Sequence, residues 1–272
     1  MPLPAGTCDT HFHVFGDSLR HPFDPRRNYT PAPAPLSRYR EVMRAFGIDR
    51  AVLVQPSVYG TDNLQLLDAL QEGGPAFRGV AVPPADIDID ALQAMHAQGV
   101  RGIRLNVLNP AVLGVDDALR VAKRAAHLGW HLQLHVALAR PDGVELLAYV
   151  AERSAVPLVI DHMGRVGPDT PIPDRLLDLL ERGSAWVKLS APYRLSGADR
   201  GDGALLDRMR TLVNANPERI LWGTDWPHTE MDASPPSTAA LVDLVASWLP
   251  DPTLRRQVCV DNPARLYGYP DA

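Results

Sequence analysis

The chain has 272 residues and a net charge of −5 at pH 7, and 46% of its residues are hydrophobic while 22% are charged. This composition predicts a packed globular protein. The negative net charge gives no basic surface for nucleic acid, and the sequence contains no apolar run of the roughly 18 residues that a membrane span needs. The stretch Met1–Gly6 lacks a signal-peptide pattern, and two cysteines, Cys8 and Cys259, give no disulfide framework, so we expect a protein of the reducing cytoplasm.

Strand and helix signals alternate along the whole chain. The predicted strands are Thr7–Val14, Arg50–Pro56, Phe77–Val82, Val100–Val107, Trp130–Val136, Pro157–Asp161, Ala185–Ser190 and Arg219–Thr224. The predicted helices are Leu36–Phe46, Asn63–Gln71, Ile89–Ala97, Val115–Leu128, Gly143–Arg153, Pro173–Arg182, Ala204–Asn214 and Ser237–Leu249. Strands such as Ala51–Val54 are apolar throughout, which is typical of parallel strands covered by helices.

Eight β-then-α units in a chain of this length predict an α/β fold, namely a (β/α)8 TIM barrel that forms a single domain over residues 1–272. Glycines such as Gly47 and Gly129 end the predicted helices just before the next strand. The tail Pro252–Tyr269 predicts a last helix with a turn at Asp261–Pro263.

Ionisable side chains stand where three of the predicted strands end. These segments are Asp9-Thr10-His11-Phe12-His13, Ile160-Asp161-His162-Met163-Gly164 and Trp222-Gly223-Thr224-Asp225-Trp226. Residues two apart in a strand share a face, so His11 and His13 should project together, with Asp9 below them. Barrel active sites lie at the carboxyl ends of the strands, and we therefore expect His11, His13, His162 and Asp225 to form one site.

Cationic side chains around this site indicate the charge of its ligand. Arg104 is predicted to face the barrel interior, where a buried cation is costly without an anionic partner, so carboxylate binding is favoured over a rim ion pair. Hydrolysis of an ester needs a base, donors for the developing oxyanion and groups that bind the substrate's charge. Asp225 can supply the base, the histidines can supply donors or a metal site, and arginines can bind carboxylates. We expect a small anionic substrate and no nucleic-acid or membrane partner.

These segments resemble the amidohydrolase superfamily, in its second large branch (amidohydrolase-related family 2). Further motifs resemble the 2-pyrone-4,6-dicarboxylate lactonases and their relatives; they are His13-Val14-Phe15-Gly16, Pro22-Phe23-Asp24-Pro25, Val54-Gln55-Pro56-Ser57, Gly60-Thr61-Asp62-Asn63, Arg101-Gly102-Ile103-Arg104, Asp161-His162-Met163-Gly164-Arg165 and Asn262-Pro263-Ala264-Arg265-Leu266-Tyr267. The resemblance runs from about Ala5 to Tyr267. It implies a barrel that hydrolyses a cyclic ester bearing carboxylates and that need not contain a metal.

The resemblance also implies residue roles. Asp225 matches the general base, and His11, His13 and His162 match the histidines around the lactone carbonyl. The matched substrate contacts are Tyr29, Ser57, Arg104, Arg165 and Arg194. His135 stands where the lactonases have a tyrosine at the substrate, which leaves the exact substrate open.

No metal is required by this hypothesis. Arg104 replaces the bridging ligand of two-metal relatives, and its charge disfavours a second cation. A single Zn²⁺ on His11, His13 and Asp225, with His135 or His162, remains an alternative.

The sequence thus predicts a lactonase that opens a small carboxylated lactone, like 2-pyrone-4,6-dicarboxylate, by water attack on the ring ester carbonyl. Three alternatives stay open: a zinc-dependent decarboxylase of an aromatic or unsaturated acid, an isomerase of sugar-acid lactones, and a non-catalytic binding barrel. The oligomeric state is not determined by the sequence, and a homo-oligomer is compatible with it.

Overall fold

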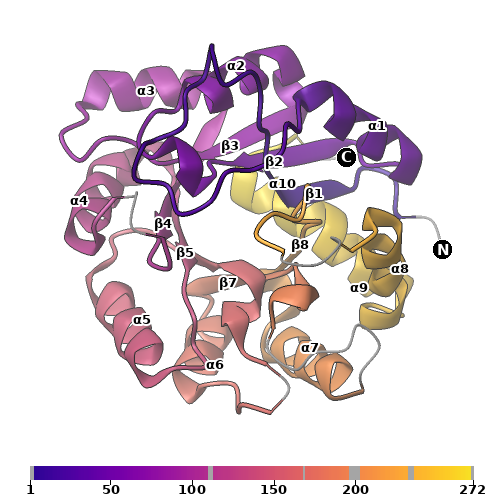
Figure 1. Ribbon diagram of the computed structural model, residues 1–272. Coiled ribbons are helices and arrows are strands. Elements are labelled where there is room, and N and C mark those ends of the chain that lie inside the picture. The colour runs from indigo at the N-terminus through magenta and orange to yellow at the C-terminus, as the bar shows by residue number, and fades with distance from the viewer. Residues whose placement is uncertain (1–2, 110–112, 168, 196–202, 232–235, 271–272) are drawn as a thin grey trace.

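The predicted (β/α)8 barrel is confirmed. The computed structural model describes residues 3–109, 113–167, 169–195, 203–231 and 236–270. Within them, eight parallel strands follow one another around a single sheet in chain order. The strands are β1 (Cys8–Phe12), β2 (Arg50–Val54), β3 (Phe77–Ala81), β4 (Val100–Asn106), β5 (His131–His135), β6 (Leu158–Ile160), β7 (Ala185–Leu189) and β8 (Ile220–Trp222). Figure 1 looks along the barrel, with the long segment after β1 crossing the front.

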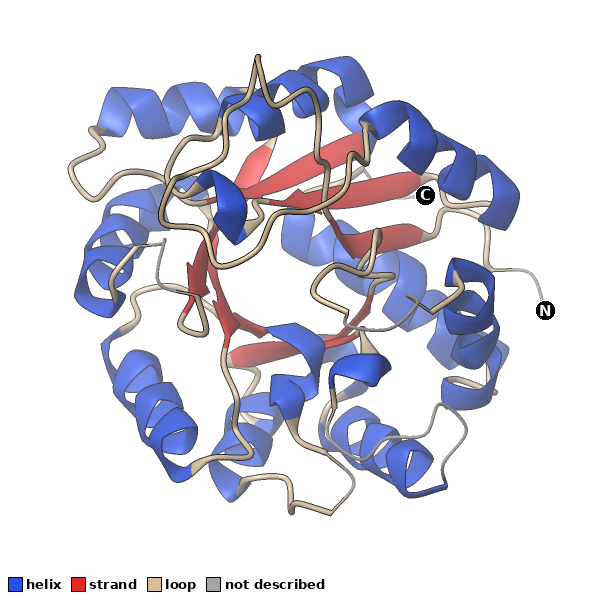
Figure 2. Cartoon of the chain, in the orientation of Figure 1, coloured by secondary structure: helices blue, strands red, loops and turns tan. Residues whose placement is uncertain are grey.

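Helices surround the strands as an outer ring (Figure 2). They are α1 (Leu36–Phe46), α2 (Leu64–Gly73), α3 (Ile89–Ala97), α4 (Val115–Ala125), α5 (Pro141–Arg153), α6 (Asp174–Glu181), α7 (Gly203–Ala215) and α8 (Thr238–Trp248), followed by α9 (Pro252–Arg256) and α10 (Asn262–Tyr267). In the described ranges, no helix is long and apolar enough to cross a membrane. Left-handed glycines end the first predicted helix at Gly47 and the helical segment before β5 at Gly129.

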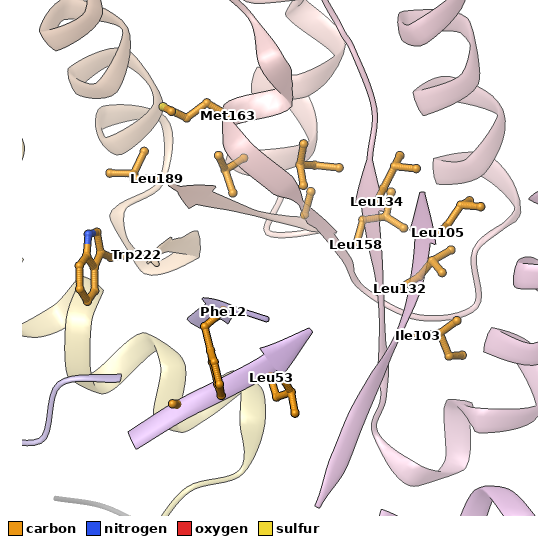
Figure 3. Close-up of a cluster of buried hydrophobic side chains, with 14 of the residues drawn as sticks. Phe12, Leu53, Ile103, Leu105, Leu132, Leu134, Leu158, Met163, Leu189 and Trp222 are labelled. Carbon is orange, nitrogen blue, oxygen red and sulfur yellow. The ribbon is translucent and has the colours of Figure 1, made fainter. Parts of the chain in front are cut away.

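Hydrophobic side chains of the strands form the layer between sheet and helices. Leu53, Leu105, Leu134 and Leu189 come from four different strands and are buried in one cluster (Figure 3). Since side chains alternate between the two faces of a strand, their neighbours in the sequence point into the barrel. The interior positions therefore stay available for polar groups.

The ring of strands closes through residues at and just beyond the ends of β1 and β8. Phe12 and Trp226 form a parallel bridge. The amide of Asp225 donates to the carbonyl of His11 over 2.8 Å, and the amide of His13 donates to that of Trp226 over 2.8 Å. Gly223 allows this approach, because a Cβ there would lie 2.8 Å from the Cβ of His11.

Asp9 does not lie below the two histidines as predicted. The pairing of β1 with β2 shifts register between Asp9 and Phe12, so the simple alternation of side chains is broken there. The Asp9 carboxylate instead accepts hydrogen bonds from the hydroxyl of Tyr39 on α1 and from the amide and hydroxyl of Thr224 beyond β8. The buried Asp9 side chain thus joins β1, α1 and the segment after β8, in the layer between the strands and the helices.

The turn predicted at Asp261–Pro263 is wrong, because this stretch is helical. A π-helical segment, Gln257–Asp261, joins α9 to α10. Pro263 lies in the first turn of α10, directly after this π-helical segment. The side chain of Asn262 donates to the carbonyls of Pro217 and Ile220. The segment thereby packs at the start of β8, behind the strands in Figure 1.

Candidate active site

A charged layer fills the middle of the barrel. Lys188 on β7 is fully buried and donates to the carbonyl of Thr10 and the side chain of Gln133, each over 2.7 Å. Asp161, which follows β6, has carboxylate oxygens 3.8 Å from Lys188 Nζ and 3.7 Å from Arg104 Nη2. Burial lowers the pKa of Lys188 to about 8. The pairing of opposite charges offsets the cost of removing them from water.

Asp161 also contacts the histidine above it. Its Oδ1 lies 3.3 Å from His11 Nδ1. Burial alone would raise the pKa of Asp161, but His11 and Lys188 lower it well below its usual range. Asp161 is therefore an anion that supports the histidine from below.

Three histidines converge on one carboxylate oxygen. The Nε2 atoms of His11, His13 and His162 lie 3.5, 3.6 and 3.7 Å from Asp225 Oδ1. A hydrogen bond of 2.7 Å joins His13 Nδ1 to the carbonyl of Val54. A carbonyl accepts only, so Nδ1 of His13 carries a proton, and Nε2 is the nitrogen that faces Asp225.

Two more contacts complete the histidine cluster. His162 Nδ1 shares a hydrogen bond of 2.8 Å with the hydroxyl of Ser190. The ring of His135 packs edge-on against His162, at 5.1 Å between centroids. Burial lowers the pKa of His11 to about 3 and those of His135 and His162 well below their usual range. These three rings are therefore neutral at pH 7.

The two oxygens of Asp225 have different environments. Oδ2 accepts hydrogen bonds from the hydroxyl of Tyr193 at 2.5 Å and from Nε of Arg194 at 2.8 Å. Oδ1 has no hydrogen-bond partner in the described part of the chain. Burial would raise the pKa of this carboxyl, but the charge of Arg194 lowers it well below its usual range. Asp225 is thus ionised, with Oδ1 facing the histidines.

Backbone turns with positive φ direct these side chains. The segment Asp161–Arg165 has left-handed angles at His162, Met163 and Arg165, with φ of 51°, 53° and 55°. This turn lets Asp161 and His162, which are consecutive, both reach the barrel interior. Asp225 has a φ of 59°. Such angles are costly for residues with a Cβ and cluster at functional sites.

The mouth of the site carries further predicted residues. Arg194 donates to the carbonyl of Thr229 over 3.0 Å as well as to Asp225. Arg165 is half-buried, within electrostatic reach of Arg194, Glu230 and Asp225. Burial raises the pKa of Tyr29 to about 12, and Ser57 and Thr229 lie beside its hydroxyl. A cavity of about 760 Å³ lies here, between the segment 28–38 and the segment 226–231.

The structure brings the predicted residues together in two layers. His11, His13, His135, His162 and Asp225 form the buried cluster. Arg194 contacts Asp225, Arg165 lies within electrostatic reach of both, and Tyr29, beside Ser57, lines the outer cavity. Arg104 lies deeper, where Asp161 and the carbonyl of Gln55 bind it. Arg194, expected at a substrate carboxylate, is bound here to Asp225.

The sequence placed two further groups, Lys188 and Tyr193, at the end of the seventh predicted strand but assigned no role to them. Tyr193 directly precedes Arg194 in the sequence, and that proximity was its only signal. Lys188 alternates with Ser190 at the end of its strand, which indicated an inward side chain but not its partners.

The cluster can accept one metal ion. His11, His13 and Asp225 offer ligand atoms within 4.8 Å of one another, and so do His11, Asp161 and His162. His11 Nε2 and Asp225 Oδ1 are buried without a hydrogen-bond partner among the described residues. Two imidazole nitrogens and a carboxylate oxygen are ligands that Zn²⁺ accepts. The residues present therefore fit a single cation.

Comparisons with known proteins place the chain among relatives of known activity. The model of the amidohydrolase family matches residues 8–269. The chain is 36% identical to a 4-sulfomuconolactone hydrolase from Hydrogenophaga intermedia, with 98% of this chain and 90% of that protein covered. It is 34% identical to a 2-pyrone-4,6-dicarboxylate hydrolase from Comamonas testosteroni, covering 97% and 91%. A crystal structure from Agrobacterium tumefaciens matches with a TM-score of 0.88 at 27% identity, covering 100% and 98%.

Proposed function

This chain belongs to the amidohydrolase family, and we propose that it hydrolyses a small carboxylated lactone by attack of water on the ring ester carbonyl. Relatives that match nearly the whole chain are hydrolases of 4-sulfomuconolactone and of 2-pyrone-4,6-dicarboxylate, which supports a carboxylic ester hydrolase. The observation that carries the proposal is the ionised Asp225, whose free Oδ1 faces three histidine nitrogens.

Asp225 acts as the general base. Its Oδ1 accepts a proton from the attacking water, while Tyr193 and Arg194 hold Oδ2 and keep the carboxylate in position. When the ring of His13 is neutral, the lone pair on its Nε2 accepts a second hydrogen bond from the same water. The water is thereby oriented by two acceptors, which raises its reactivity as proton transfer begins.

His162 stabilises the negative charge that develops on the carbonyl oxygen. When its Nδ1 accepts from the hydroxyl of Ser190, its Nε2 carries the proton and can donate to that oxygen. Arg165, and the Nη1 end of Arg194 that Asp225 does not contact, bind the substrate's carboxylates, since guanidinium and carboxylate form charge-assisted hydrogen bonds. A zinc ion held by His11, His13 and Asp225 would add Lewis-acid activation of a bound water.

A panel of lactones tests the proposal. The purified protein is assayed with 2-pyrone-4,6-dicarboxylate, 4-sulfomuconolactone and lactones of sugar acids, with product identification and zinc quantification. Ring-opened acids are the expected products. An isomeric lactone would instead indicate an isomerase, and release of CO2 from aromatic acids would indicate a decarboxylase. Absence of ring opening across the panel contradicts the proposal.

A further inference from the structure

Glu230 lies among the residues that are proposed to bind the substrate. Its Oε2 is 3.7 Å from Nη1 of Arg194, and its side chain is 35% exposed. With Tyr29 it lines the cavity of about 760 Å³ at the mouth. Its backbone has a φ of 59°, a left-handed angle that is uncommon for a residue with a Cβ.

The charge of Glu230 acts on three of the proposed substrate contacts. Burial lowers the pKa of Arg194, whereas Asp225, Tyr193 and, more weakly, Glu230 raise it. Glu230 also opposes the lowering of the pKa of Arg165 that burial causes. It also adds to the rise in the pKa of Tyr29, which is mainly due to burial. One carboxylate therefore lies within electrostatic reach of all three side chains, as a substrate carboxylate would.

The charges around the site nearly cancel when Glu230 is included. The groups linked to one another through Asp161, Asp225 and Glu230 are these three anions and the cations Lys188, Arg104, Arg165 and Arg194; Arg38, at the outer cavity, lies outside this linked set. This inventory leaves one positive charge for a ligand. If Glu230 were neutral, two positive charges would be left, enough for a ligand with two anionic groups.

We propose that Glu230 is a specificity-determining residue, an internal anion at the place of a second substrate carboxylate, so that the protein favours lactones with one anionic group over those with two. This inference rests on the proposed function in that the ligand is a carboxylated ring. A second substrate carboxylate would lie beside the carboxylate of Glu230, and repulsion between these two like charges disfavours its binding.

The test compares Glu230→Gln with the wild type by titration calorimetry. The probes are pyridine-2-carboxylate and pyridine-2,4-dicarboxylate, two stable rings that differ by one carboxylate. Gln keeps the shape of the side chain and removes its charge. The control is Glu218→Gln, which removes the same charge from a residue paired with Arg265, 3.1 Å away, in the segment that precedes β8 at the opposite end of the barrel.

Glu230→Gln is expected to tighten binding of the dicarboxylate by about tenfold more than binding of the monocarboxylate, equivalent to about 1.4 kcal/mol. A moderate effect is expected because the group is partly exposed and screened by water. Glu218→Gln should leave the ratio of the two affinities unchanged. Equal changes for both probes, an equal shift in the control, or no binding of the dicarboxylate to Glu230→Gln would overturn the inference.

Kinetics separate this inference from the proposed function. The same variants are assayed with 2-pyrone-6-carboxylate and 2-pyrone-4,6-dicarboxylate, and the ratio of their kcat/KM values should move with the affinity ratio. If the wild type opens neither ring while the affinity ratio changes as expected, the proposed function fails and the role of Glu230 stands. If the wild type opens both and the ratio does not move, the role of Glu230 fails alone.

Discussion

At the scale of single residues, Asp225 combines full burial with a negative charge and one oxygen that has no hydrogen-bond partner among the described residues. Asp225→Asn should therefore lower kcat by about 10²–10⁴-fold, because an amide cannot accept the proton of the water. Circular dichroism and the melting temperature would show that the fold is retained. A variant that hydrolyses its lactone within threefold of the wild type would disprove the assignment of the base.

The hydroxyl of Tyr193 fixes which oxygen of Asp225 is free. Tyr193→Phe removes the 2.5 Å hydrogen bond to Oδ2 and is expected to lower kcat by about 10- to 100-fold, the effect of losing a hydrogen bond to a charged group. KM should stay within about twofold, since the hydroxyl is directed at the base. Tyr149→Phe is the matched control, because its hydroxyl donates to Asp116 on the surface. A change in KM alone would indicate a substrate contact instead.

The cluster of His11, His13 and Asp225 also determines whether the protein depends on a metal. We predict that protein freed of metal by EDTA retains most of its lactonase activity, because the charge of Arg104 opposes cation binding nearby and the neutral histidines can orient water and carbonyl themselves. Activity and zinc content are measured before and after treatment. Stoichiometric zinc whose removal abolishes activity, and whose return restores it, would make His11, His13 and Asp225 ligands.

At the scale of elements, Asp9 joins β1, α1 and the end of β8. Asp9→Ala leaves the amides of His11 and Thr224 without their acceptor, and each buried unsatisfied group costs about 1–3 kcal/mol. The free energy of unfolding, measured with urea, should fall by several kcal/mol. Asp49→Ala is the control, since Asp49 accepts one exposed hydrogen bond from Gly6. Equal losses in both variants would contradict the role of Asp9.

The elements themselves could be predicted from the sequence, because hydrophobic periodicity and glycine ends are local signals. The strand ends also indicated which side chains lie near one another. The outward direction of Asp9 could not be predicted, since the register shift arises from pairing with β2. The pairing of Arg194 with Asp225 could not be predicted either. The two residues lie 31 positions apart, and their contact depends on the backbone turns at Ala191 and Asp225, both of which have a positive φ. The helix at Pro263 could not be predicted either, because it depends on packing against the start of β8, which local turn signals do not reveal.

At the scale of the whole molecule, buried neutral histidines make stability depend on pH. Burial lowers the pKa of His131 from 6.5 to about 3, so the unfolded chain binds more protons between these values, and stability falls as pH decreases through this window. One such group contributes up to about 1.4 kcal/mol per pH unit. In His131→Leu, the decline in unfolding free energy from pH 6.5 to 4.5 should therefore be less steep. An unchanged slope would show that His131 is not buried as a neutral ring.

The hydrogen bonds that complete the ring of strands come from His11, His13, Asp225 and Trp226 themselves. The reactive residues thus form the seam of the barrel, where its first and last strands meet. Activity and closure of the barrel therefore depend on the same backbone contacts between the first and last strands. Loss of activity should follow loss of these contacts and need not accompany loss of the helices. Mild heat or denaturant that opens this contact should inactivate the protein while the outer helices still give their circular dichroism signal.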